Sequence, residues 1–200
     1  MEVQTSPFRK VTAATAADVC RRVELSPEAV AVLLPELSPQ AFLARLVDSR
    51  QFSDAVRFLA FCLPSREAVW WACVIARDNE LSPSETTCLE RVVAWAYEPD
   101  EPKRRACMEA AEQLNFEGAA AYAALSAFWS GGSMAPEGLP PAPPDPKLCP
   151  IGAAASILLA VTAGEAQSMA ERFEAAIERG VDIANGGNGK LKSVSRRSMS

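Results

Sequence analysis

The chain has 200 residues, enough for one large domain or for a domain with an appended segment, and 49% of them are apolar, as in a globular protein. The formal net charge is −5, and the four cations of the last twelve residues (Lys190, Lys192, Arg196 and Arg197) leave the rest of the chain at −9. An acidic body excludes nucleic acid as the main partner, because phosphate binding requires clustered lysine and arginine side chains.

The cysteine and histidine content limits the compartment and the cofactors. Six cysteines are present, none in a CxxC pair, and histidine is absent. We therefore expect reduced core thiols, a cytoplasmic location and no metal or other cofactor.

Two further patterns bear on targeting. The first residues lack the basic start and apolar core of a secretory leader. The longest apolar run, Ile151 to Ala163, is shorter than the roughly twenty residues of a membrane-spanning helix. We expect no leader and no membrane insertion.

The N-terminal part predicts a loose segment over residues 1–14, followed by a helical domain over residues 15–130. Within that domain the tripeptide Leu-Ser-Pro occurs at residues 25–27, 37–39 and 81–83. Its serine can accept a hydrogen bond from a free amide of the first helical turn, and its proline fits the first helical position. We predict helix starts at Ser26, Ser38 and Ser82, the last with a Ser82–Glu85 capping box.

From Ser38 onward the apolar periodicity predicts evenly sized helices joined by short connections. Their expected ranges are 38–49, 52–62, 65–78, 82–97, 100–114 and 117–130. Short connections force neighbouring helices to be antiparallel. The predicted fold is all-α, a compact multi-helix domain arranged either as an orthogonal bundle or as a short α-solenoid, since Leu-Ser-Pro recurs at about the period of a helical pair.

The helix expected at residues 65–78 is apolar around most of its circumference, which predicts a buried central helix with Ser65 as its cap. Adjacent positions on a helix point about 100° apart. Of Trp70 and Trp71, one should therefore lie in the core and the other near a rim, where it could anchor a partner. Arg66 and Arg77 mark the two ends of the helix, either as polar sites or as caps and ion pairs.

Beyond residue 130 the composition changes. Residues 131–149 are rich in proline and glycine and predict a stiff spacer. We expect one C-terminal helix over residues 150–185, interrupted near Gly164, and a disordered basic tail over residues 186–200. The second half of this helix carries a narrow apolar stripe, Met169, Phe173 and Ile177, which we expect to be available to a partner's groove.

Residues suited to catalysis are present only in weak patterns. Carboxylates lie close together at Glu109 and Glu112, and at Glu98, Asp100 and Glu101. On exposed amphipathic helices such groups usually form a solvated face, but they leave open an enzyme with a carboxylate- or thiolate-based site.

The run from Leu63 to Cys73, LPSREAVWWAC, resembles a signature of a functionally uncharacterised bacterial family of helical proteins. Some of its members are similar in setting to accessory components encoded near type VI secretion genes. The resemblance covers residues 15–130 and implies an accessory or adaptor role without catalytic residues.

We therefore expect a non-enzymatic cytoplasmic module that binds another protein; the sequence does not fix its oligomeric state. The candidate partner-binding residues are Arg66, Trp70, Trp71, Arg77, Met169, Phe173 and Ile177.

Overall fold

The computed structural model describes residues 8–136, 138–163 and 168–190, and within them every regular element is a helix. This confirms the all-α prediction. The α-helices are α1 (Ala16–Cys20), α2 (Pro27–Ala31), α3 (Pro39–Asp48), α4 (Phe52–Cys62), α5 (Ser65–Ala76), α6 (Pro83–Tyr97), α7 (Glu101–Gln113), α8 (Gly118–Phe128), α9 (Leu148–Thr162) and α10 (Met169–Ala184).

The three Leu-Ser-Pro starts form as predicted. The hydroxyl oxygens of Ser26, Ser38 and Ser82 each accept a hydrogen bond from the backbone amide three residues later, and a proline occupies the first turn of each helix. At α6 the Glu85 carboxylate accepts a hydrogen bond from the Ser82 amide, completing the predicted capping box. The start of α5 differs, because Pro64 is the N-cap and Ser65 is already helical and makes no cap bond.

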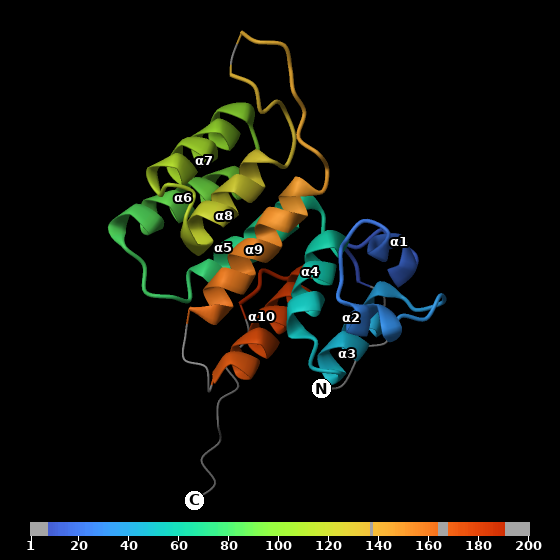
Figure 1. The fold of residues 1–200 in the computed structure, drawn as a ribbon. Coiled ribbons are helices and arrows are strands. Elements are labelled where there is room, and N and C mark those ends of the chain that lie inside the picture. Colours follow the sequence, from blue (N-terminus) through green and yellow to red (C-terminus); the bar gives the residue numbers. More distant parts are fainter. Residues whose placement is uncertain (1–7, 137, 164–167, 191–200) are drawn as a thin grey trace, which may run out of the picture.

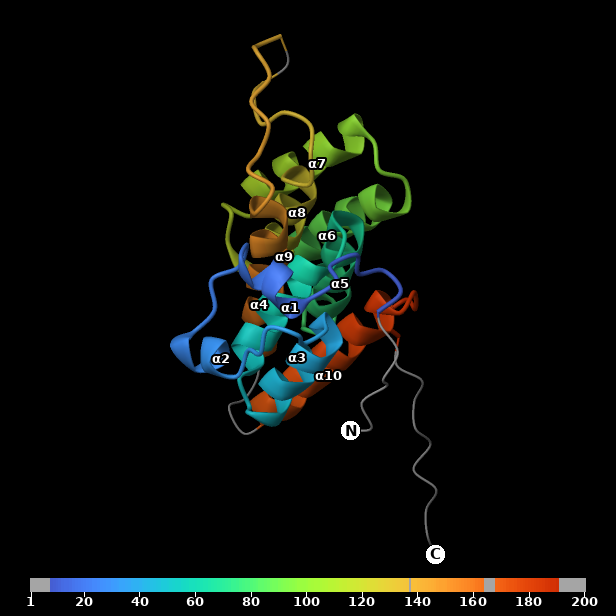
Figure 2. The same ribbon diagram turned by 90° about the vertical axis from the view of Figure 1, so that its right-hand side faces the viewer.

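Helix α5 lies at the centre of the molecule and contacts α6, α8, α9 and α10. Figures 1 and 2 show α6, α7 and α8 gathered on one side, α1, α2 and α3 on the other, and α4, α5 and α9 between them. Helix α9 also contacts α4, far from it in sequence. A solenoid joins each repeat mainly to its neighbours, so the arrangement is a closed bundle.

After residue 130 the chain has the predicted order of a proline-rich segment and then helix, but α9 begins at Leu148, inside the range predicted as spacer. The proline-rich segment projects from the bundle and doubles back (Figure 1), and the Met134 amide donates to the Ala142 carbonyl at 2.8 Å. The predicted C-terminal helix is divided into α9 and α10. The interruption expected near Gly164 falls in residues 164–167, which lie outside the described part. Apolar residues of both helices belong to the same continuous core as those of α3 to α8.

The described part of the N-terminal lead-in packs against the bundle. Phe8 is buried, and the Lys10 amide donates to the Ala184 carbonyl at the end of α10 at 2.9 Å. These contacts bring residue 10 next to α5, where it contributes to the site described next. The part of the loose segment before residue 8 and the part of the basic tail after residue 190 lie outside the described residues.

Candidate functional site

A small pocket opens on the partly exposed face of α5, beside Trp70. Its volume is about 220 Å³, and its walls come from α5, the last turn of α6, the loop that follows α10 and the N-terminal lead-in. The side chains that define it are Lys10, Arg66, Glu67, Trp70 and Tyr97. We call this the Trp70 pocket.

Two aromatic rings form its rim. The indole Nε1 of Trp70 donates to the Asn188 carbonyl at 3.0 Å, which fixes the ring against the loop after α10. Tyr97 packs edge-on against Trp70, with the ring centroids 5.7 Å apart and the planes at 75°. Tyr97 is nevertheless 71% exposed, so most of its ring faces solvent. An aromatic ring that is held in place and left uncovered is a feature of interface anchors.

Charged groups surround the rings. Arg66 donates through Nε to the Ala96 carbonyl, one of the acceptors that the end of α6 leaves without a helical partner. Lys10 and Glu67 form an ion pair at 2.9 Å. The pocket therefore combines aromatic surface with both signs of charge, and its charged side chains are partly held by other residues.

The loop after α10 owes its shape to Asp182. The Asp182 carbonyl accepts from the Gly187 amide and its carboxylate accepts from the Gly189 amide, both at 2.8 Å. A Cβ at Gly187 would lie only 2.1 Å from that carboxylate, so the close turn requires glycine there. The same turn presents the Asn188 carbonyl to Trp70.

The structure separates the two tryptophans, as predicted. Trp71 is completely buried, and its indole Nε1 donates to the Ala176 carbonyl of α10 at 2.8 Å. Arg77 is exposed at the opposite end of α5, beside Asp78, which pairs with Arg179 of α10 at 2.6 Å. Of the residues predicted on α5, only Arg66 and Trp70 meet in one pocket.

The stripe predicted on α10 faces the bundle. Phe173 stacks on Phe52, with the centroids 5.7 Å apart, and both Phe173 and Ile177 are buried. Met169 is partly buried and packs against the same core. The surface that this stripe would offer a partner is covered by the chain's own helices, so a partner would reach it only if α10 moved away.

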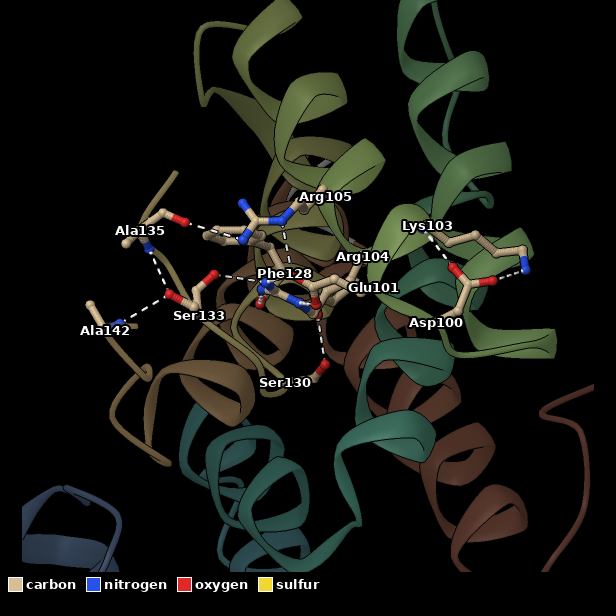
Figure 3. A network of polar contacts seen from close by, with 11 residues as sticks. Asp100, Glu101, Lys103, Arg104, Arg105, Phe128, Ser130, Ser133, Ala135 and Ala142 are labelled. Atoms are coloured by element: carbon tan, nitrogen blue, oxygen red, sulfur yellow. Dashed lines mark hydrogen bonds and ion pairs between the residues drawn. The ribbon is translucent and has the colours of Figure 1, made fainter. Parts of the chain in front are cut away.

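Glu101 lies in a second polar cluster, at the base of the proline-rich loop (Figure 3). Glu98 and Asp100 instead pair with Lys103. Glu101 accepts two bonds from the Arg104 guanidinium, each 2.7 Å, and pairs with Arg105 at 2.8 Å. Arg104 is buried, stacks over the Phe128 ring, and also donates to the Phe128 and Ser133 carbonyls. This cluster therefore fastens the loop to α7 and α8.

The same contacts set the ionisation of the carboxylates. Hydrogen bonds from Lys103 lower the pKa of Asp100, and hydrogen bonds from Arg104 lower the pKa of Glu101. A general acid needs a raised pKa, so neither carboxyl group is tuned for that role. Glu109 and Glu112 are exposed on α7.

The six cysteines are free, and five of them are buried. Burial raises the pKa of Cys73 to about 11 and that of Cys88 and Cys107 to about 12, and it also raises the pKa of Cys62 and Cys149. Cys20, which is partly exposed, also has a raised pKa because of burial. A nucleophilic cysteine requires the thiolate, so these thiols are core groups.

Tyr97, Lys10 and Asn188 complete the Trp70 pocket, and sequence analysis missed all three. The exposure of Tyr97 could have been predicted from the sequence. Tyr97 directly follows Ala96, which lies on the apolar face of the helix, so the tyrosine itself points away from that face. The places of Lys10 and Asn188 could not have been predicted, since they reach the pocket only through the packing of the chain ends.

Fold and site together define a compact all-helical protein with an exposed aromatic pocket. The chain belongs to DUF6931, a family of unknown function, whose profile matches residues 42–184. The match extends past the region of the sequence resemblance and includes the proline-rich loop and both final helices. No curated protein and no solved structure matches the chain.

Two further properties hold for the part of the chain that the structure describes. It contains no group of three or more cysteine or acidic side chains that could hold a metal ion. Its helices are all too short or too polar to cross a membrane.

Proposed function

We propose that this protein is a non-enzymatic interaction module that binds another protein through the Trp70 pocket. The observation that carries the proposal is the exposed Tyr97 ring, held edge-on against Trp70 at the mouth of the pocket. Tryptophan, tyrosine and arginine are the residues that most often dominate binding energy at protein interfaces, and Arg66 lines the same pocket.

The size of the pocket supports a protein ligand. Small-molecule and cofactor sites usually enclose about 300–1,000 Å³. The Trp70 pocket, at about 220 Å³, suits one inserted side chain, with the rest of the partner lying across the aromatic rim. The Lys10–Glu67 pair at the rim would add specificity more than affinity, because an exposed ion pair contributes little energy.

We further propose that the module is an accessory or adaptor protein of a bacterial secretion system, of the type VI class, acting in the cytoplasm. The support for this setting is the sequence resemblance over Leu63 to Cys73, which forms the helix that carries Trp70. Six free cysteines are consistent with a reducing compartment.

A photo-crosslinking amino acid at position 97 tests the proposal in native cells. Position 30 is the matched control, because Val30 is also well exposed, at 53%, but lies on α2. We expect a discrete crosslinked partner from position 97 only, lost when Trp70→Ala is added. Equal crosslinking from both positions, or none from position 97, would contradict the proposal.

A second readout separates binding from stability. Tyr97→Ala removes a mostly exposed ring, so we expect the free energy of unfolding to change by no more than about 0.5 kcal/mol.

Mass spectrometry of the crosslinked partner tests the proposed secretion-system setting. A type VI component supports that setting, and an unrelated protein contradicts it.

A further inference from the structure

A second concave surface lies beside α9, away from the Trp70 pocket. It is an open groove of about 630 Å³ between the segment after α1, the second half of α4 and one face of α9. Phe61, Ile151 and Leu158 are among the apolar side chains that line it, and Ile151 is 47% exposed. We call this surface the α9 groove.

The α9 groove is elongated. Lys147, the N-cap of α9, lines its beginning, and Ile151, Ala155 and Leu158 line it from successive turns of the helix. At 1.5 Å per residue, the distance from position 147 to position 158 is about 16 Å. That length matches about three turns of a second helix laid alongside.

The groove is positively charged although the chain as a whole is negative, at −5. Arg22, Arg57 and Lys147 line it together with Glu24, and the buried Asp54 pairs with Arg57. The cations still outnumber these two carboxylates, so the groove, with its exposed apolar side chains, is complementary to a ligand that is both acidic and apolar.

Two of these cations are held in position. Arg22 donates to the Phe61 carbonyl at the end of α4 at 3.1 Å. Arg57 lies 3.4 Å from Asp54, whose carboxylate is fixed by bonds from the amide and hydroxyl of Ser26. The three cations come from three different parts of the chain, because Arg22 follows α1, Arg57 belongs to α4 and Lys147 is the N-cap of α9.

We propose that the α9 groove docks a short acidic amphipathic helix of a partner protein. The partner's apolar stripe packs on Ile151 and Leu158, and its carboxylates face Arg22, Arg57 and Lys147. This is the helix-in-groove mode of recognition. Three cations from three parts of the chain suit several carboxylates on one helix face, whereas a fatty acid presents a single carboxylate. The site is independent of the Trp70 pocket.

The test uses the full chain and a labelled helical peptide about 14 residues long, with leucine at every third or fourth position and glutamate between. Fluorescence anisotropy should show binding that weakens as salt is raised. Ile151→Asp and Lys147→Glu should each weaken binding by at least about tenfold. Both positions are exposed, and unchanged thermal midpoints would confirm that the variants fold.

Leu159→Asp is the matched control, because Leu159 is 41% exposed on α9 but does not line the groove. We expect it to bind the peptide as the native chain does, and we expect a peptide with lysine in place of glutamate not to bind. The proposal is overturned if the acidic peptide fails to bind, if the lysine peptide binds equally, if Leu159→Asp loses as much affinity as Ile151→Asp, or if laurate binds more tightly than the peptide.

Discussion

Trp70 and Trp71 are neighbours in the chain, but their side chains lie in two regions that differ in exposure. The Trp71 region is closed: its indole is fully buried, and Gly180 of α10 lies directly against it. The Trp70 region is open: its indole lines a pocket and supports an exposed tyrosine. Both indole N–H groups donate to carbonyls of α10 or of the loop after it. The C-terminal segment therefore closes the core and shapes the pocket at the same time.

The largest expected loss of stability comes from a substitution on α10 that disrupts the closed region. Phe173→Glu places a carboxylate where a buried ring stacks on Phe52, so we expect a loss of at least about 4 kcal/mol in the free energy of unfolding. Leu158→Glu is the control, since Leu158 is only partly buried and lines the α9 groove. Urea denaturation measures both, and a larger loss for Leu158→Glu would show that α10 is not part of the core.

A smaller change tests how closely α10 approaches α5. A Cβ at Gly180 would lie 2.6 Å from Leu59 and 2.7 Å from the Trp71 ring, and both of those side chains are fully buried. We expect Gly180→Ala to cost about 1–3 kcal/mol through overpacking. Gly131→Ala, where a Cβ meets nothing within 4 Å, should cost far less. Equal thermal midpoints for the two variants would contradict the close contact.

The smallest expected change in stability comes from Glu101, at the base of the proline-rich loop, and this change should depend on pH. The pKa of Glu101 is lowered in the folded state, so its contribution to stability is present above the unfolded pKa, near 4, and is lost as the pH falls through the folded value. Glu101→Gln should therefore lower the urea midpoint at neutral pH and match the native chain in strong acid. A difference that persists or grows in acid would contradict the role given to this carboxylate.

Local signals in the sequence predicted much of the fold. The Leu-Ser-Pro caps fixed three helix starts because capping depends on a few adjacent residues. The 100° step between neighbouring helical positions predicted that Trp70 and Trp71 would differ in environment, though not which would be buried. The narrow stripe on α10 predicted a surface available to a partner, but Gly180 continues the same face and allows the helix to approach Trp71.

The remaining features depend on contacts between distant parts of the chain. Composition showed that the proline-rich segment after residue 131 could not continue a helix, but not that α9 begins already at Leu148, nor that the segment doubles back and is held by Arg104 and Arg105. The Trp70 pocket likewise joins residues 10, 97 and 188, which no local pattern relates. Contacts between residues this far apart in the chain leave no short motif from which they could be predicted in a single sequence.

The central claim is that α5 gives one tryptophan to the core and the other to an exposed binding surface. The most direct test is the free energy of unfolding of Trp71→Ala and Trp70→Ala, measured by urea denaturation on the full chain. We predict a loss of about 3–5 kcal/mol for Trp71→Ala, from the buried cavity. For Trp70→Ala we predict a loss of about 1 kcal/mol, from one hydrogen bond and partial packing. Equal losses for the two variants would contradict the division between core and surface.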